Sequence, residues 1–319
     1  MKEVFLCSNI RLYGDKMYNS SLELIGNGPL ILLNNIMKKY NFKGNLYAKY
    51  EGFNLTGSIK DKAVITILKD LEEKSILLPN MKIVEATSGN TGISLALIGH
   101  LLGYKVIIVM PENMSLERKK LILKYQAKLI LTPKEEGMAG AIKKAKYIAN
   151  EENTIYFNQF YQKGNIDAHY KMTAREIDLE LKGHLDTIIC GIGSAGTIMG
   201  LAKYFKRGNL MPKIIGIEPA SSPFISEGIK GSHKIAGIGA GFYPPILDRT
   251  LIDDIIKITD DEACLGSKIL LEEEGLFCGI SSGASLMAAM KFKNKENILI
   301  ILLFLNNSYG LPFCFSHFY

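Results

Sequence analysis

A single lysine, Lys60, follows a stretch of small, flexible residues and precedes a regular helix-forming run. This arrangement presents one amine at the start of a predicted helix, where the chain can approach a bound molecule closely. A lysine amine in a partly desolvated pocket can lose its proton near neutral pH and attack a carbonyl carbon. A lysine after a turn can also be an ordinary surface residue, so the role of Lys60 depends on the motifs that accompany it.

The first of three glycine-rich turns covers residues 87–92, after a predicted strand and at the start of a predicted helix. Free backbone N–H groups at a helix start can bind a carboxylate. A helix start needs only one capping residue, whereas this turn has four polar side chains around two glycines: Thr87, Ser88, Asn90 and Thr91 around Gly89 and Gly92. The pattern therefore predicts a carboxylate receptor, and the Asn90 amide could meet a phenolic or carbonyl oxygen.

The second turn, residues 190–200, also joins a predicted strand to a predicted helix. Its glycines let the backbone close around a compact anion, for which phosphate is the natural ligand. Dinucleotide-binding folds contain a glycine-rich turn as well. Of the two ligands, we favour a smaller phosphorylated cofactor.

The third turn, residues 278–285, enters an alanine-rich predicted helix. Its serines either cap this helix or offer a hydroxyl to a ring nitrogen, and both interpretations stay open. A lysine, a phosphate-binding turn, an asparagine and a serine together suit pyridoxal phosphate. Lys60 can bind its aldehyde, residues 193–197 its phosphate and Asn90 its ring oxygen.

These motifs lie within an alternation of short apolar runs and amphipathic stretches. Strands are predicted at residues 82–86, 105–110, 128–132, 187–192, 213–218, 255–259 and 298–305, and helices at 90–102, 115–125, 137–150, 196–205 and 260–274. Apolar strands separated by helices indicate parallel sheets covered on both faces, so the predicted class is α/β. Because ligands gather at the carboxyl ends of parallel strands, we expect the site in a cleft between two domains.

The composition argues against several other classes of protein. The net charge of +6 is spread over 319 residues without a basic block interleaved with aromatics, which argues against nucleic acid. No segment approaches the roughly 20 apolar residues of a membrane helix. The first ten residues do not resemble a signal peptide, so we predict a cytoplasmic protein. The cysteines show no CxxC spacing, so no metal site is predicted.

From about residue 24 to about residue 293 the chain resembles the cysteine synthase (O-acetylserine sulfhydrylase) and cystathionine β-synthase family of fold-type II pyridoxal-phosphate enzymes. The resemblance rests on motifs in the family's order: the turn with Lys60, then residues 87–92, 193–197, 237–242 and 279–284. It implies a tryptophan synthase β-like fold of two three-layer domains with mostly parallel sheets. Residues 52–155 would form a smaller mobile domain, and residues 1–51 with 156–319 a larger phosphate-binding domain. It also implies a homodimer.

The resemblance assigns a role to each motif. Lys60 would carry the cofactor and act as acid and base at the substrate α-carbon. The substrate carboxylate would bind Thr87, Ser88, Gly89, Asn90, Thr91 and Gln159. The cofactor phosphate would bind Gly193, Ser194, Ala195, Gly196 and Thr197, its ring oxygen Asn90 and its pyridine nitrogen Ser281.

The reaction implied is a β-replacement, in which O-acetyl-L-serine loses acetate and sulfide is added to give L-cysteine. Two alternatives within the same chemistry stay open: homocysteine as nucleophile, as in cystathionine β-synthase, or an amino donor, as in 2,3-diaminopropionate synthase. From another class, the chain could be a binding or regulatory relative without turnover.

The sequence departs from the family's pattern at five places. Gly28 stands where threonine is usual, and residues 55–57 differ from the usual Pro-Gly. Ala195 replaces a glycine, and Lys62 replaces an arginine, which loses a bidentate donor. From Phe304 onward the chain is aromatic-rich and unpatterned, and our hypothesis is a frameshifted or truncated terminus.

Overall fold

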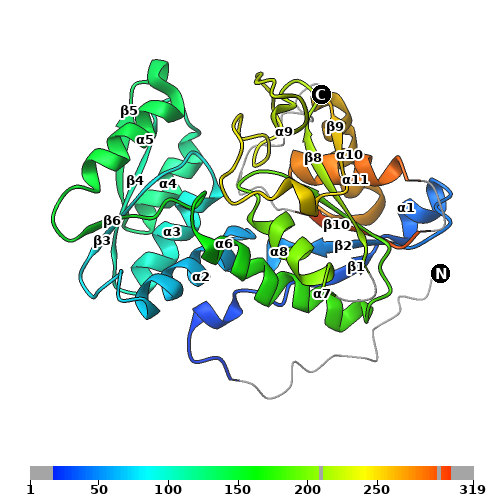
Figure 1. The fold of residues 1–319 in the computed structure, drawn as a ribbon, viewed down its shortest axis with the longest axis horizontal. Helices are drawn as coiled ribbons and strands as arrows, with labels where there is room; N and C mark the ends of the chain where they lie inside the picture. Colours follow the sequence, from blue (N-terminus) through cyan, green and yellow to red (C-terminus); the bar gives the residue numbers. More distant parts are fainter. Residues whose placement is uncertain (1–16, 208–210, 293–295, 303–319) are drawn as a thin grey trace, which may run out of the picture.

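The computed structural model describes residues 17–207, 211–292 and 296–302. Within them the chain forms an α/β fold with two sheets, each covered by helices (Figure 1). The hypothesis on the terminus from Phe304 lies outside the described residues. None of the helices in the described part of the chain combines the length and the apolar character that crossing a membrane requires.

The smaller sheet has four parallel strands in the order β5-β4-β3-β6. Their bounds are Lys82–Ala86 for β3, Lys105–Pro111 for β4, Lys128–Thr132 for β5 and Thr154–Tyr156 for β6. The first three confirm the predicted strands. Strand β6 was missed, because it has only three residues within a polar, turn-rich stretch.

Helices cover both faces of this sheet, as its alternating side chains require. The helices are α2 (Lys60–Glu73), α3 (Asn90–Leu101), α4 (Leu116–Lys124) and α5 (Gly137–Ile148). Ile83 and Ile108 pack in one cluster with apolar residues of α2 and α3. Val84 and Val109 point to the other face, where they pack with α5. Because neighbouring residues of a strand face opposite ways, this pattern makes a three-layer unit.

The larger sheet has six strands in the order β1-β2-β10-β7-β8-β9. Their bounds are Leu30–Leu32 for β1, Leu46–Tyr50 for β2, Thr187–Gly191 for β7, Lys213–Pro219 for β8, Asp254–Ile258 for β9 and Ile298–Leu302 for β10. Only β1 runs antiparallel to its neighbour. All five residues of β10 are buried, which explains its unbroken apolar sequence.

The helices of the larger unit also lie on two faces. One apolar cluster includes residues of α1 (Asn34–Lys39), α10 (Asp260–Glu274) and α11 (Ile280–Met290). The opposite cluster includes residues of α7 (Ala174–Leu181) and α8 (Gly196–Phe205). The remaining helical segments are α6 (Lys163–Ala168), a π-helical turn (His169–Thr173), α9 (Phe224–Glu227) and the 3₁₀ turns Ser21–Leu24, Glu51–Phe53, Lys134–Glu136 and Arg249–Leu251.

Candidate active site

A cavity of about 370 Å³ lies where carboxyl ends of strands from both sheets meet. Every site residue predicted from the sequence lines this cavity: Lys60, Thr87, Ser88, Gly89, Asn90, Thr91, Gln159, Gly193, Ser194, Ala195, Gly196, Thr197 and Ser281. The fold therefore brings together five segments that are far apart in the sequence.

Local hydrogen bonds fix Lys60 at the first position of α2. The preceding Gly57 has φ +74°, a left-handed conformation that glycine adopts without steric cost. The Asp61 carboxylate accepts hydrogen bonds of 2.6 Å from both the backbone N–H and the hydroxyl of Thr56. The Ser58 hydroxyl accepts from the Lys60 N–H at 3.2 Å. These contacts hold the turn so that the Lys60 side chain enters the cavity.

The electrostatic surroundings of Lys60 favour the neutral amine. Burial lowers the pKa of Lys60, and only the nearby Cys190 opposes this shift. No Asp or Glu is among the described residues that line the cavity. Burial in turn raises the pKa of Cys190 to about 12, so its thiol stays protonated at neutral pH. Lys60 is therefore the group in this cavity best suited to attack an electrophilic carbon.

Hydrogen bonds fix the turn before α3, which lines the cavity. The Thr87 hydroxyl accepts from the Gly89 N–H at 3.2 Å. The Thr91 hydroxyl donates to Gln159 Oε1 at 2.8 Å, which ties the buried Gln159 to this turn. Asn90 Oδ1 is buried and has no hydrogen-bond partner among the described residues. Because buried polar atoms are normally paired, this oxygen fits a site that a ligand completes.

The turn before α8 has the backbone of an anion cradle. Ala195 adopts φ +68°, and a side chain at Gly193 would approach the Gly237 carbonyl oxygen to 2.2 Å. The left-handed conformation at Ala195 costs about 1 kcal/mol relative to glycine. Asn165 Nδ2 donates to the Ser194 hydroxyl at 3.0 Å and so fixes this side chain. Ala195 thus adopts a left-handed conformation at the position where the family usually has glycine.

The structure, and not the spacing of the glycines, decides whether the second turn is suited to a dinucleotide. Gly191, Gly193 and Gly196 have the spacing found in dinucleotide-binding turns, and Glu218 lies near the end of the next strand, β8. The sequence therefore did not exclude a dinucleotide. In the structure Glu218 is buried and accepts from the Ile225 N–H at 2.8 Å. It does not line the cavity, so it is not placed to bind a ribose.

In the third turn, the structure shows which serines face the cavity. Ser281 and Ser285 line it, whereas Ser282 does not. Helix α11 begins at Ile280, and its N-cap residue Gly279 makes no side-chain capping bond. The helix-capping interpretation of these serines is therefore wrong. Ser281 stays the candidate partner of a ring nitrogen.

A family model described as pyridoxal-phosphate dependent enzyme matches residues 22–303. The chain belongs to this family. The residues of the cavity fit the cofactor, since they include a lysine with no Asp or Glu in the described lining, an anion cradle and an Asn90 oxygen that no described residue pairs. The α/β class and the fold-type II arrangement that the resemblance implied are thereby confirmed.

Individual relatives are similar over nearly the whole chain. Cysteine synthase B of Campylobacter jejuni is 44% identical over 294 residues, which covers 92% of this chain and 96% of that protein. Cystathionine beta-synthase of Apis mellifera is 40% identical over 299 residues, which covers 90% of this chain but 59% of that protein. The crystal structure of a cysteine synthase from Entamoeba histolytica has a TM-score of 0.88 and 34% identity, and covers 91% of this chain and 88% of that chain.

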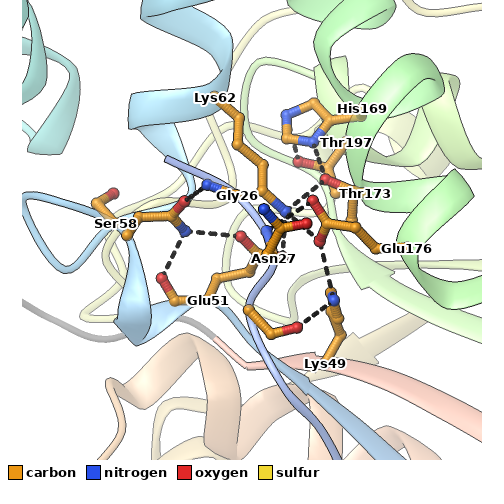
Figure 2. Close-up of polar contacts among 12 residues, drawn as sticks. Gly26, Asn27, Lys49, Glu51, Ser58, Lys62, His169, Thr173, Glu176 and Thr197 are labelled. Carbon is orange, nitrogen blue, oxygen red and sulfur yellow. Dashed lines mark hydrogen bonds and ion pairs between the residues drawn. The ribbon is translucent and has the colours of Figure 1, made fainter. Parts of the chain in front are cut away.

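Next to the cavity of this pyridoxal-phosphate family member lies a buried ion cluster, shown in Figure 2: Lys49, Lys62, Glu51 and Glu176. Lys62 Nζ lies 2.9 Å from Glu51 Oε1 and 2.8 Å from Glu176 Oε2. Burial alone would lower the pKa of Lys62, but these two carboxylates outweigh burial and raise it. Lys62 thus occupies the position of the family's arginine as a fully paired cation.

A chain of hydrogen bonds leads from this cluster to the phosphate turn (Figure 2). Lys62 Nζ lies 3.3 Å from the Thr173 hydroxyl, Thr173 lies 3.0 Å from His169 Nδ1, and His169 Nε2 lies 3.2 Å from the Thr197 hydroxyl. Burial and the charges of Lys62 and Lys60 lower the pKa of His169 well below its usual value. An ammonium group can only donate, so Thr173 accepts from Lys62 and can donate to His169. When Thr173 donates to Nδ1 of a neutral His169, Nε2 carries the proton and donates to Thr197, whose own hydroxyl hydrogen is then free for the cavity.

Sequence reasoning missed several residues of the site, among them Arg118, Tyr156, Asn165 and His169. It also missed Glu85, which is buried at the end of β3 and accepts from the Asn158 N–H at 2.8 Å. Burial raises the pKa of Glu85 to about 8. None of these residues lies in a glycine-rich turn, so the pattern that found the other site residues could not find them.

Proposed function

We propose that this protein catalyses a β-replacement that converts O-acetyl-L-serine and sulfide to L-cysteine and acetate. The observation that carries the proposal is the single cavity in which Lys60 faces the turn at residues 87–92, the turn at residues 193–197 and Ser281. The printed names of the relatives, cysteine synthases among them, support the same reaction.

The residues of the cavity divide between cofactor and substrate. We assign the cofactor aldehyde to Lys60, the phosphate to residues 193–197, the ring oxygen to Asn90 and the pyridine nitrogen to Ser281. The substrate carboxylate is assigned to residues 87–91 and Gln159. The Thr91–Gln159 hydrogen bond supports this assignment, because it joins two residues of the same receptor.

Pyridoxal phosphate, when bound, supplies an electron-withdrawing ring that stabilises negative charge at the substrate α-carbon. Lys60 Nζ removes the α-proton, because its lowered pKa makes the neutral amine accessible. Ser281 would offer a neutral hydroxyl to the pyridine nitrogen and would leave that nitrogen largely uncharged, a state that would suit a substrate with a good leaving group such as acetate. After sulfide has added to the β-carbon, Lys60 returns the proton to the α-carbon.

The domain division belongs to the same proposal. We propose that residues 52–155 form a smaller mobile domain, which carries the carboxylate-binding turn, and that residues 1–51 and 156–319 form the larger, phosphate-binding domain. Binding of the substrate carboxylate draws the smaller domain over the cavity and excludes water. The protein is proposed to act as a cytoplasmic homodimer, which measurement of its mass in solution tests.

The deciding experiment follows purified protein when O-acetyl-L-serine and then sulfide are added. We expect a visible absorption band of bound cofactor, a change of that band with release of acetate, and formation of cysteine on addition of sulfide. A protein that takes up no pyridoxal phosphate, or a band that does not respond to O-acetyl-L-serine, contradicts the proposal. The second outcome favours a different substrate or a binding role without turnover.

A second candidate function uses homocysteine as nucleophile. The 40% identity to a cystathionine beta-synthase supports it, although this chain covers only 59% of that protein. An amino donor, as in 2,3-diaminopropionate synthase, is a third nucleophile for the same chemistry. Competition between sulfide, homocysteine and an amino acid at equal concentration ranks the three, and we expect cysteine as the main product.

A further inference from the structure

Arg118 is a cavity residue for which the proposed roles leave no function. It lies in the first turn of α4, whose N-cap Ser115 accepts from the Arg118 backbone N–H. Its guanidinium group lines the cavity and donates through Nη1 to the Ser88 carbonyl oxygen at 3.0 Å. The Nε atom is buried and has no hydrogen-bond partner among the described residues.

No carboxylate of the described chain pairs with Arg118. Its neighbour Glu117 acts on it only through space and forms no ion pair with it within the described ranges. The cavity lining contains two basic side chains, Lys60 and Arg118, and, over the residues that the structure describes, no Asp or Glu. A guanidinium group cannot lose its proton in a protein. A partly buried charge without a partner is costly, so Arg118 fits a site that an anion completes.

The proposed assignments leave two anions without a binding residue, the departing acetate and the nucleophile. The cofactor phosphate is assigned to residues 193–197, which belong to the turn before α8. The substrate carboxylate is assigned to N–H and hydroxyl groups of residues 87–91. Arg118 contacts that turn only at the Ser88 carbonyl oxygen, an acceptor that cannot itself bind an anion. The remaining reactant is the nucleophile, and hydrosulfide carries a negative charge near neutral pH.

We propose that Arg118 binds the incoming nucleophile as an anion and so selects hydrosulfide, or another small anionic nucleophile, over a neutral one. This inference rests on the proposed function. The C–S bond forms from a lone pair of HS⁻, and the S–H proton stays on sulfur. The electron pair of the carbon–carbon double bond left by the loss of acetate moves to the α-carbon, where Lys60 Nζ returns the proton. Arg118 stabilises the anion until this bond forms.

The test separates the two halves of the reaction in Arg118→Met and Arg118→Lys. Acetate released from O-acetyl-L-serine without nucleophile measures the first half, and cysteine formed on later addition of hydrosulfide measures the second. Lys120→Met is the matched control, because Lys120 lies on the same helix, is exposed and does not line the cavity. Far-ultraviolet circular dichroism checks that each variant is folded.

We expect Arg118→Met to release acetate within about threefold of the unchanged protein. Its half-saturating concentration of hydrosulfide should rise about 10- to 100-fold, because the variant loses a charge-assisted contact. Arg118→Lys keeps the charge, so its half-saturating concentration of hydrosulfide should lie between those of Arg118→Met and the unchanged protein. Calorimetric titration of the cofactor-loaded protein with nitrate, an unreactive anion, should show binding that Arg118→Met abolishes and Lys120→Met retains.

Two results overturn the inference. If Arg118→Met slows acetate release as much as it weakens the response to hydrosulfide, Arg118 positions the carboxylate-binding turn through Ser88. If nitrate binds Arg118→Met as well as the unchanged protein, Arg118 is not an anion site. Failure of the proposed function is a different result, since the unchanged protein would then release no acetate. The nitrate titration still decides the role of Arg118 in that case.

Discussion

Two lysines, two residues apart at the start of α2, have opposite surroundings. Lys60 enters a cavity in which the described lining contains no carboxylate, and burial lowers its pKa. Lys62 points to the buried ion cluster, where Glu51 and Glu176 outweigh burial and raise its pKa. Residues i and i+2 of a helix lie on different faces, so each side chain meets a different set of neighbours.

The difference shows that the neighbours, and not the type of side chain, decide what a buried lysine does. Two N–H groups of Lys62 meet carboxylate oxygens and a hydroxyl lies within reach of the ammonium, so this side chain is fixed as a cation. Lys60 has no such partner in the described part of the chain, and its neutral form is therefore favoured. Lys60 is available for chemistry, whereas Lys62 holds the surrounding carboxylates in place.

The largest expected effect comes from Lys60→Ala. Activity should fall by about 10²- to 10⁴-fold, the contribution of a positioned acid/base group. Mass spectrometry after reduction with borohydride should find cofactor attached to the unchanged protein and not to the variant.

The stability of the cofactor-free Lys60→Ala variant sharpens the comparison. Burial lowers the pKa of Lys60 in the folded state, so folding disfavours its ammonium form and this group destabilises the folded protein where the unfolded chain keeps its proton. Urea unfolding should therefore show no decrease in the free energy of unfolding. A decrease as large as that of Lys62→Met would contradict the contrast between Lys60 and Lys62.

Lys62→Met should have the next largest effect. It leaves the carboxylates of Glu51 and Glu176 without their shared cation, and loss of one partner of a buried ion pair costs about 3–5 kcal/mol. Urea unfolding measures this decrease in the free energy of unfolding. Lys62→Arg, which restores the family's usual residue, is the control and should keep most of the stability. A decrease below about 1 kcal/mol in Lys62→Met would mean that the cluster does not hold the fold.

Glu85→Gln tests a buried carboxyl group whose pKa is raised by burial. The pKa of Glu85 rises from 4.5 to about 8, mainly because of burial, so between these values the folded state holds a proton that the unfolded state has lost. The free energy of unfolding should therefore fall as pH rises from 4.5 to about 8. Glu85→Gln should flatten this dependence, measured by urea unfolding at several pH values. The same slope in the variant would contradict the assignment.

Ala195→Gly should have the smallest effect. Glycine removes the cost of about 1 kcal/mol for a left-handed alanine. It also loses a buried methyl group, worth about 0.8 kcal/mol, and gains freedom in the unfolded chain. The free energy of unfolding should therefore change by less than about 1 kcal/mol, and cofactor affinity should stay within about threefold. A larger loss of affinity would show that the Ala195 methyl group itself shapes the phosphate turn.

Prediction from the sequence worked best where a local rule was strong. Long apolar strands such as β4 and helix starts after glycine-rich turns were found within one or two residues. Strands β1, β2 and β6 were missed, because they are short or partly polar and form only by pairing with distant strands. The choice between a dinucleotide and pyridoxal phosphate shows the same limit. In the sequence, the glycine-rich turn and Glu218 are compatible with both cofactors, and only the tertiary contact of the Glu218 carboxylate decides between them.

The sequence by itself determined the chemistry that this protein can perform. A lysine after a flexible turn and three glycine-rich helix starts are local features, fixed by backbone geometry and by the types of a few neighbouring residues. Only the tertiary structure decided the surroundings of each lysine, because Glu51, Glu176 and Cys190 come from different segments of the chain. Whether a buried amine is neutral or charged depends on these distances, and the fold alone sets them.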